Sequence, residues 1–226
     1  FWAARWLDYR RWDDPAFRAR IDLRESFLQG YEEGMAVLTG LRETASAVAD
    51  AEFPGLIRFL AGAGESESAM RLAATAAEEA PEDPEARIFL AEVATEGRFY
   101  EQARESYRQA LVLGGDPEDL NPRIAWLDEG LPGGEDIQFS SAELEAMAGQ
   151  YGPRLVTLED GVLKYSRDGG PEVTRVPLTR TLFALEANAT FRLRFEEGPE
   201  GVFGRVVGRY SDGRTDESVR TREDQM

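Results

Sequence analysis

Histidine and cysteine are both absent from this 226-residue chain, and lysine occurs once, at Lys164. Without histidine the chain has no ordinary general base near neutral pH, no imidazole metal ligand, and no serine or cysteine mechanism that depends on imidazole. Without cysteine it has no disulfide, thiolate metal site or cysteine nucleophile. Paired carboxylates, a serine with the lone lysine, and a hard cation held by oxygens remain as enzyme chemistries. We expect this chain to carry no catalytic residue, metal site or cofactor.

A long hydrophobic run is also missing, and the 43 acidic residues outnumber the 26 basic ones. No apolar stretch approaches the roughly 20 residues that span a bilayer, so membrane insertion is not expected. The formal net charge of −17 repels phosphate backbones, which argues against a nucleic-acid partner. The chain begins at Phe1 with no signal-peptide pattern, which favours a piece of a longer precursor.

The apolar pattern changes its period near residues 131–139. Apolar residues recur every three to four positions before this stretch and alternate in short runs after it, which predicts helices followed by strands. The expected fold is α+β, with an N-terminal helical-hairpin array and a C-terminal antiparallel meander forming a barrel or half-barrel. The predicted domains are an aromatic and long-helix segment (1–50), helical repeats (51–130), a linker (131–139), a β-domain (140–222) and a tail (223–226).

One long helix is predicted to start after Asp14-Pro15, because its apolar residues advance in steps of four and three. The stripe is Phe27, Tyr31, Met35, Leu38, Leu41, Ala45 and Val48. An aromatic cluster precedes it: Phe1, Trp2, Trp6, Leu7, Tyr9 and Trp12. These aromatics either pack on the stripe or form a seam exposed by a missing upstream domain.

Between Phe53 and Gly130, helical patterns of 11 to 15 residues alternate with Gly- and Pro-containing breaks, the rhythm of antiparallel helix pairs. In the second helix of the segment 85–113, Ala103 and Ala110 allow close approach while Tyr107 fills the gap. This small-large-small spacing resembles a tetratricopeptide repeat. The resemblance implies a protein or peptide partner on a concave face, or a scaffolding role. Candidate binding residues on the repeats are Arg87, Tyr100 and Arg104.

The second half begins with a short helix capped by Ser140 or Ser141 and continues in six predicted strands. Asp160-Gly161 between apolar runs is the clearest hairpin signal. In the fifth strand, Phe191, Leu193 and Phe195 should form a buried face, alternating with Arg192 and Arg194 outside. Six strands predict a core filled by side chains. The arginines Arg154, Arg192, Arg194, Arg205 and Arg209 are either a solvated outer face or a stripe that binds a carboxylate or the acidic repeats, with Arg192 and Arg194 as candidate binding residues.

Lys164 and Ser166 lie two residues apart on a predicted strand and should share a face. A catalytic dyad is one interpretation, and a solvated strand face is the other. The spacing lacks the S-x-x-K pattern, and no oxyanion hole is marked. We expect the solvated face.

An ordered set of short motifs runs through the β-half, including Gly149-Gln150-Tyr151-Gly152, Asp160-Gly161-Val162-Leu163, Phe191-Arg192-Leu193-Arg194-Phe195 and Gly208-Arg209-Tyr210-Ser211-Asp212-Gly213. Over residues 140–222 it resembles the small β-module appended to bacterial β-lactamase-like serine hydrolases and S41-type peptidases. That module carries no known catalytic residue, and the catalytic domain lies upstream. The resemblance implies a periplasmic or secreted setting and a hydrolase as parent or partner.

Three functional hypotheses follow. The first is a non-catalytic accessory or interaction region of a bacterial hydrolase or its partner, with the repeats as scaffold or docking surface and the β-domain as a structural module. The second is a stand-alone peptide- or protein-binding repeat module. The third is a carboxylate-based hydrolase, which requires a cleft with two acids roughly 5–10 Å apart.

Overall fold

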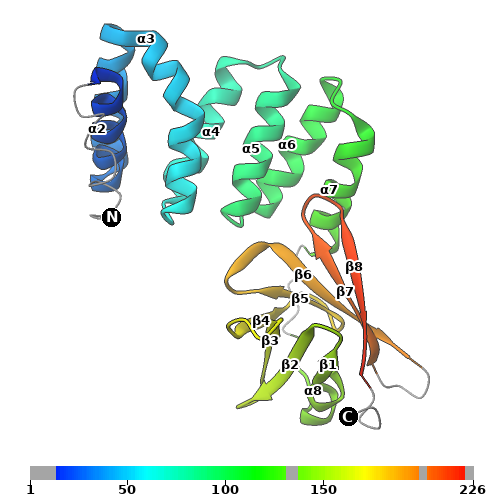
Figure 1. Cartoon of the computed structure of the whole chain (residues 1–226). Coiled ribbons are helices and arrows are strands. Elements are labelled where there is room, and N and C mark those ends of the chain that lie inside the picture. The colour runs from blue at the N-terminus through cyan, green and yellow to red at the C-terminus, as the bar shows by residue number, and fades with distance from the viewer. Residues whose placement is uncertain (1–13, 131–136, 199–202, 222–226) are drawn as a thin grey trace. The chain divides into compact units, whose positions relative to one another are not determined.

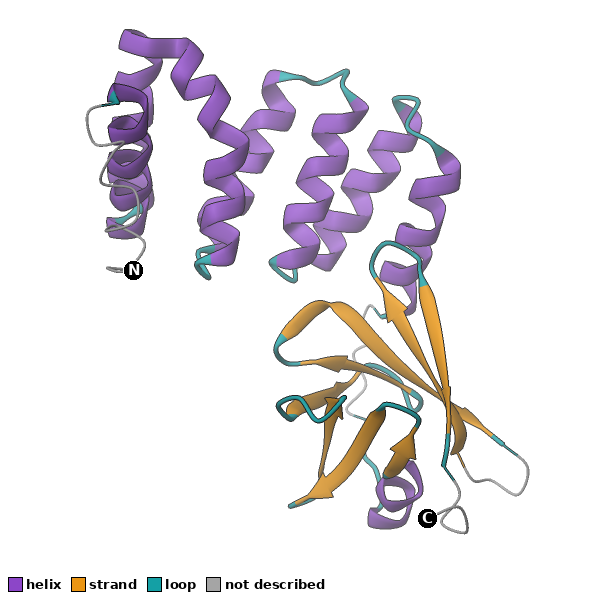
Figure 2. Cartoon of the chain, viewed as in Figure 1, coloured by secondary structure: helices purple, strands orange, loops and turns teal. Residues whose placement is uncertain are grey.

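The structure, a computed structural model, describes residues 14–130, 137–198 and 203–221. The chain divides into two compact units, Phe1–Gly97 and Arg98–Met226. All strands follow the long helices along the chain (Figure 2), so the predicted α+β class is confirmed. The predicted N-terminal aromatic cluster and most of the predicted linker lie outside the described residues.

The first unit contains four described helices, and the second contains three helices and all the strands (Figure 1). The sequence analysis grouped all helices before residue 131 together. In the structure, the helices at residues 100–112 and 117–129 belong to the same compact unit as the sheet. The helices are α2 (Pro15–Gln29), α3 (Tyr31–Gly62), α4 (Ser66–Glu79), α5 (Pro84–Glu96), α6 (Tyr100–Val112), α7 (Pro117–Glu129) and α8 (Ser141–Met147).

Three helices start at an Asp-Pro pair. The Asp14, Asp83 and Asp116 side chains each accept a hydrogen bond from the backbone N–H two residues later, at 2.9, 3.0 and 2.9 Å. An aspartate at the N-cap satisfies a free helical donor, and proline tolerates the first helical position because it has no N–H to leave unpaired. These local rules explain why α2, α5 and α7 begin where they do.

The prediction of one long helix after residue 15 is wrong. The helix breaks at Gly30, which has extended backbone, and α3 is kinked again at Ala45. The first part of α3 lies beside α2 (Figure 1). Gly34 makes this approach possible, since a Cβ there would sit 2.3 Å from the Phe27 ring. The apolar residues keep their helical spacing across the break because those on both sides of it pack into the same core.

The first unit is built around leucine, phenylalanine and alanine side chains from all four of its helices. Leu38, Ile57, Leu60 and Leu72 are buried to 1% exposure or less. The unit therefore has its own hydrophobic core, formed by helix packing. Among the described residues, none of the helices is both long enough and apolar enough to span a bilayer.

The segment that resembles a tetratricopeptide pair is divided between the units, with α5 in the first and α6 in the second. On α6, Ala103 and Ala110 are fully buried and Tyr107 is nearly so. Within the second unit, α6 packs on α7, where the Arg123 guanidinium lies 5.8 Å from the centre of the Tyr107 ring. The small-large-small residues thus occupy buried positions on one helix.

The strands of the second unit form one antiparallel sheet in which each pairs with the next in sequence. The Asp160-Gly161 turn has positive φ at both residues and joins Glu159 to Val162, as the hairpin signal predicts. The strands are β1 (Gly149–Tyr151), β2 (Arg154–Glu159), β3 (Val162–Arg167), β4 (Val173–Pro177), β5 (Leu182–Leu185), β6 (Asn188–Glu197), β7 (Phe203–Tyr210) and β8 (Thr215–Val219).

The sheet curls into a nearly closed barrel. Tyr151 in β1 pairs with Arg220 just after β8, and the Thr221 N–H donates to the Gln150 carbonyl at 2.8 Å. The six-strand prediction missed β1, which is three residues long, and β8, whose sequence Thr-Asp-Glu-Ser-Val carries almost no apolar signal. Eight strands rather than six give the barrel the number at which an interior can hold a small ligand.

Aromatic side chains dominate the barrel interior. Tyr151, Phe191, Leu193 and Phe195 are at most 5% exposed, so β6 presents the predicted buried face. Phe195 touches three other rings edge-on, with its centroid 5.6 Å from those of Phe183 and Phe203 and 6.0 Å from that of Tyr151. Edge-to-face contacts at these separations add to the gain from burying the rings.

Candidate functional site

The structure brings some of the predicted binding residues together and separates others. The Arg192 guanidinium lies 5.3 Å from the centre of the Tyr100 ring. Arg194 pairs with Glu129 at 3.2 Å, and Arg104 pairs with Asp128 at 3.2 Å. Arg87 lies on α5, in the first unit.

Arg192 holds α7 against the outer face of β6. Its guanidinium stacks 3.5 Å from the centre of the Trp126 ring and donates to the Trp126 carbonyl, and it is 1% exposed. The Trp126 Nε1–H donates in turn to the Arg209 carbonyl of β7 at 3.1 Å. A cation on the face of tryptophan is stabilised by the ring quadrupole, most strongly when water is excluded.

Glu129 at the end of α7 pairs with two arginines of the sheet, Arg194 at 3.2 Å and Arg209 at 2.7 Å. Two glycines allow the surfaces to meet. A Cβ on Gly130 would lie 2.0 Å from the Arg192 guanidinium, and one on Gly213 would lie 2.4 Å from Pro122 of α7. Three arginines of the predicted stripe, Arg192, Arg194 and Arg209, therefore lie against an acidic helix.

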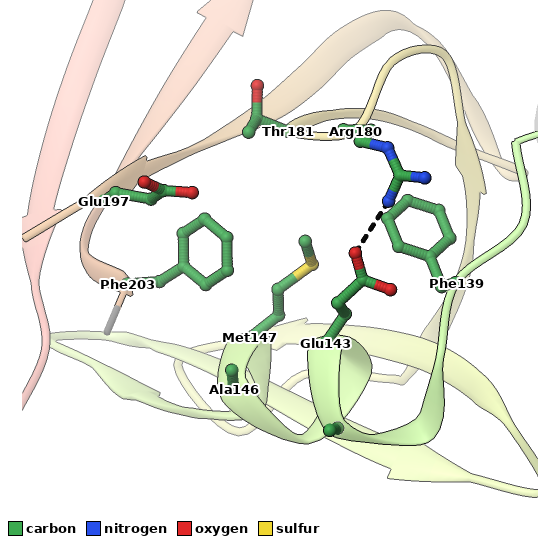
Figure 3. A pocket seen from close by; sticks show the side chains of 9 residues that line it. Phe139, Glu143, Ala146, Met147, Arg180, Thr181, Glu197 and Phe203 are labelled. Carbon is green, nitrogen blue, oxygen red and sulfur yellow. Dashed lines mark hydrogen bonds and ion pairs between the residues drawn. The ribbon is translucent and has the colours of Figure 1, made fainter. Parts of the chain in front are cut away.

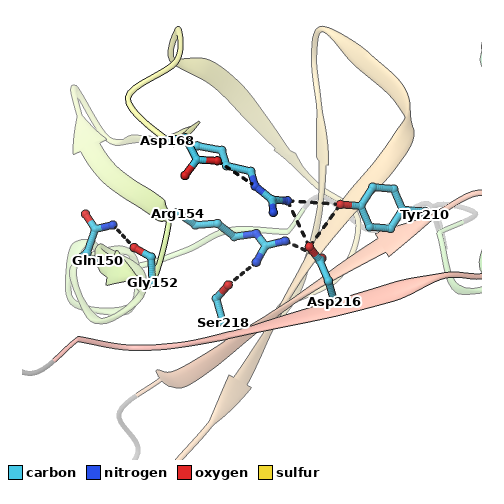
Figure 4. Close-up of polar contacts among 8 residues, drawn as sticks. Gln150, Gly152, Arg154, Asp168, Tyr210, Asp216 and Ser218 are labelled. Carbon is cyan, nitrogen blue, oxygen red and sulfur yellow. Dashed lines mark hydrogen bonds and ion pairs between the residues drawn. The ribbon is translucent and has the colours of Figure 1, made fainter.

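Arg154 and Arg205, also in the predicted stripe, have other partners. Arg205 pairs with Glu196 and Glu217 and is partly exposed. Arg154 is 1% exposed and binds Asp216 at 2.5 Å and the Ser218 hydroxyl, both on β8 (Figure 4). Arg167 reaches the second Asp216 oxygen at 3.1 Å. Polar strand β8 is thus held to β2 and β3 by arginine contacts.

Burial raises the pKa of Asp216, but its hydrogen bonds and charge interactions with Arg154 and Arg167 outweigh this, and the pKa lies below its ordinary value of 3.8. A carboxyl with a depressed pKa in the folded state stabilises the fold above its unfolded pKa and loses that contribution as the pH falls through the folded pKa. The stabilisation by Asp216 is therefore complete at neutral pH and is lost in the range below 3.8.

Asp216→Asn should lower stability at pH 7 by about 2 kcal/mol, because it leaves the buried Arg154 guanidinium without its counter-charge. Stability should also fall less steeply below pH 3.8, because asparagine takes up no proton in either the folded or the unfolded state. Urea unfolding at several pH values measures both effects. Asp168→Asn is the matched control, because Asp168 also pairs with Arg167, at 3.5 Å, but its side chain is largely exposed. Equal acid profiles for Asp216→Asn and the unsubstituted chain would contradict this account.

A pocket of about 290 Å³ lies beside α8 in the second unit. Its apolar wall comes from Phe139, Ala142, Ala146, Met147 and Phe203. In Figure 3 the Met147 side chain stands between Phe203 and Glu143, and Glu197 lies on the side opposite Arg180. A largely apolar concavity with a few polar groups is the usual form of a small-molecule site.

The seven-residue helix α8 is held at both ends. Ser140 and Glu143 form a capping box at its start, as the sequence indicated. Arg220 donates to the Ala146 and Ala148 carbonyls at its end, at 2.8 and 2.6 Å. A cation at the C-terminal carbonyls complements the helix dipole. Such a short helix is therefore positioned by side chains, and it gives the pocket a fixed wall.

Glu143 and Glu197 bring two acids from different elements to this pocket. Hydrogen bonds from the Ser140 backbone and hydroxyl lower the pKa of Glu143, and Arg180, paired with it at 2.6 Å, lowers it further. Glu143 is thus held as a carboxylate.

The Lys164 amine pairs with Glu159, and this hydrogen bond raises the pKa of Lys164. Ser166 is buried, while Lys164 is partly exposed. In the described segments, no three acidic side chains gather closely enough to hold a metal ion. Lys164 is therefore tied to an acid at the surface, and Ser166, the other residue of the dyad interpretation, is buried.

Comparison with known proteins gives no relative from which a role can be transferred. No protein-family model matches the chain, and no curated protein or solved structure matches it either. The helical N-terminal region and the C-terminal barrel-like sheet thus rest on the structure itself.

One buried charge was missed by the sequence analysis. Arg175 on β4 is 4% exposed and lies inside the barrel. The signal was available, because in Val-Thr-Arg-Val-Pro the arginine shares a strand face with Val173 and Pro177. The sequence analysis did not single out this arginine, and the structure places it in the core.

Proposed function

We propose that this chain is a non-catalytic accessory or interaction region that belongs to, or accompanies, a bacterial hydrolase. Its helices act as a scaffold or docking surface, and the barrel acts as the structural module to which part of that scaffold is attached. The resemblances to tetratricopeptide pairs and to hydrolase accessory modules support this role. The chain's lack of histidine and cysteine is in accord with it.

The directions of two pKa shifts are in accord with a non-catalytic role. Hydrogen bonds lower the pKa of Glu143 and raise that of Lys164, so both groups are held more firmly in their charged forms. A general acid needs a carboxyl pKa raised toward neutrality, and a lysine base or nucleophile needs a lowered one. The pKa of Glu143 is lowered instead of raised, and that of Lys164 is raised instead of lowered.

The observation that carries the proposal is the way the barrel arginines hold a helix. Arg192, Arg194 and Arg209 are engaged by one acidic helix, α7. The outer face of this barrel binds α7 through charge pairs and a cation–π contact, and contacts of the same kind can dock a protein partner.

A second candidate is the carboxylate-based hydrolase, and one observation favours it. Glu143 and Glu197 line the same pocket from α8 and from the end of β6. Two carboxyl groups across a small cleft are the arrangement used for glycoside hydrolysis. A proton donor there would have to be Glu197, since Glu143 is held ionised by Ser140 and Arg180.

Activity of the purified chain separates the two candidates. We expect hydrolysis of 4-nitrophenyl acetate, 4-nitrophenyl glycosides and a fluorogenic casein to remain at the buffer rate, with no change in Glu143→Gln or Glu197→Gln. A rate that is well above buffer and is lost in either variant would refute the non-catalytic role. Circular dichroism of both variants controls for folding.

A further inference from the structure

The pocket beside α8 has two sides, and each side carries a carboxylate and an aromatic ring. On one side the Arg180 guanidinium pairs with Glu143 at 2.6 Å and lies 5.9 Å from the centre of the Phe139 ring. On the other side lie Glu197 and Phe203 (Figure 3). Among the described residues, no cation pairs with Glu197 or lies over the Phe203 ring. The two sides therefore share their chemistry but differ in having a cation of the protein.

Strand pairing brings Glu197 and Phe203 together. They are direct partners in the register of β6 and β7, where the pairing shifts between Glu196 and Glu197. Side chains directly opposite each other on antiparallel strands project from the same face, with Cβ atoms about 5 Å apart. Such irregularities commonly redirect a side chain beside a binding site. Glu196 instead pairs with Arg205 and lies outside the pocket lining.

The charges of the pocket favour a cationic ligand. Its lining holds two carboxylates and one guanidinium, which leaves a net charge of −1. Glu143 and Arg180 offset each other as an ion pair, so the remaining charge is that of Glu197. A carboxylate next to the face of a ring attracts an ammonium group twice, through its charge and through the ring quadrupole. The anion and the Phe203 ring thus form a site for a cationic head.

The rest of the pocket fits a hydrocarbon body. Ala142, Ala146 and Met147 of α8 form an apolar wall between the two charged sides. The volume of about 290 Å³ suits a body of several carbons rather than a long lipid chain. The Met147 side chain has a flexible thioether that adapts to the shape of its neighbour. A ligand with both a cationic head and a short apolar body therefore matches the whole lining.

We propose that the pocket beside α8 binds a small organic ammonium ion. The charged head lies between the Glu197 carboxylate and the Phe203 ring, and the hydrocarbon body packs on Ala146 and Met147. The head thereby gains the same surroundings that the Arg180 guanidinium has on the opposite side of the pocket. This inference does not depend on the accessory role proposed above.

NMR titration of the full chain with hexylammonium, hexan-1-ol and hexanoate at neutral pH tests the proposal. We expect hexylammonium to bind about 3- to 30-fold more tightly than hexan-1-ol, because one exposed ion pair and one cation–π contact act together. Hexanoate should bind most weakly of the three, since the pocket is negative. Equal affinities for the ammonium ion and the alcohol, tighter binding of hexanoate, or no shift of the Ala146 and Met147 amide resonances would overturn the proposal.

Two neighbouring glutamates give a matched pair of variants. Glu197→Gln keeps the size of an exposed side chain and should lose the preference for hexylammonium over hexan-1-ol. Glu196→Gln removes the same charge one residue away, from a side chain that pairs with Arg205, and should keep the preference. A preference that survives Glu197→Gln, or that falls equally in both variants, would refute the placement of the head at Glu197.

Removing the protein's own cation gives an independent check. Arg180→Met leaves Glu143 and the Phe139 ring without their cation and makes the pocket more negative. It should strengthen hexylammonium binding about two- to fivefold, the range expected for one exposed charge interaction. Weaker binding of hexylammonium in Arg180→Met would contradict the charge argument on which the proposal rests.

Discussion

Leu193→Asp is expected to abolish cooperative folding of the second unit. Leu193 is fully buried on the inner face of β6, between the inward-facing Phe191 and Phe195. The substitution removes a core side chain and places a carboxylate among the aromatic rings of the barrel interior. Loss of the buried leucine costs about 3 kcal/mol, and removing the charge from water adds several more. The sum is comparable with the whole stability of a small domain.

Urea unfolding followed by far-UV circular dichroism measures the effect. Two-dimensional NMR of the folded fraction shows whether the barrel resonances are dispersed. Val219→Asp is the matched control, since Val219 lies on β8 with 69% exposure and should change stability by less than about 0.5 kcal/mol. A soluble Leu193→Asp protein with a cooperative barrel transition would show that the inner face of β6 has been wrongly assigned.

Trp126→Ala is expected to lower the stability of the second unit by about 3 to 5 kcal/mol. Trp126 is 1% exposed and is one of the residues through which α7 meets the sheet. Its loss removes a large buried ring, the hydrogen bond to the Arg209 carbonyl and the surface on which Arg192 stacks. Arg192 has an Nε and an Nη2 without partners, so it depends strongly on that ring.

Two controls separate these contributions. Trp126→Phe keeps an aromatic face but loses the indole N–H, and should cost less than the alanine substitution. A double-mutant cycle with Arg192→Met should give a coupling of about 1 kcal/mol or more, because the two side chains are in direct contact. Additive effects, or a Trp126→Ala protein as stable as the unsubstituted one, would contradict the attachment of α7 to the barrel through this pair.

Local chemistry in the sequence accounts for much of the fold. Asp-Pro pairs specify three helix starts, Ser140 with Glu143 specifies a capped short helix, and Asp160-Gly161 specifies a hairpin turn. Each of these signals acts between residues at most three apart. The alternation of Phe191, Leu193 and Phe195 also identified the inner face of a strand, because strand side chains alternate between faces.

Other features could not be read locally. The break at Gly30 depends on Phe27 packing against Gly34 of the next helix. Strand β8 contains few apolar residues. Besides its pairing with β7, it is held by Asp216 and Ser218, which bind the distant Arg154. The candidate pocket combines residues from α8 with others more than 30 positions further along the chain. No period or spacing encodes such pairings.

The sequence by itself determined the order of helices and strands, several of their ends, and the limits on chemistry that follow from having no histidine or cysteine. Only the tertiary structure decided which arginines are in solvent. Arg154, Arg175 and Arg192 are all buried, yet one meets an acid, one meets only aromatic rings, and one meets a helix carbonyl. The physical reason is that strand alternation assigns a side chain to a face, while the environment of that face is made by segments tens of residues away.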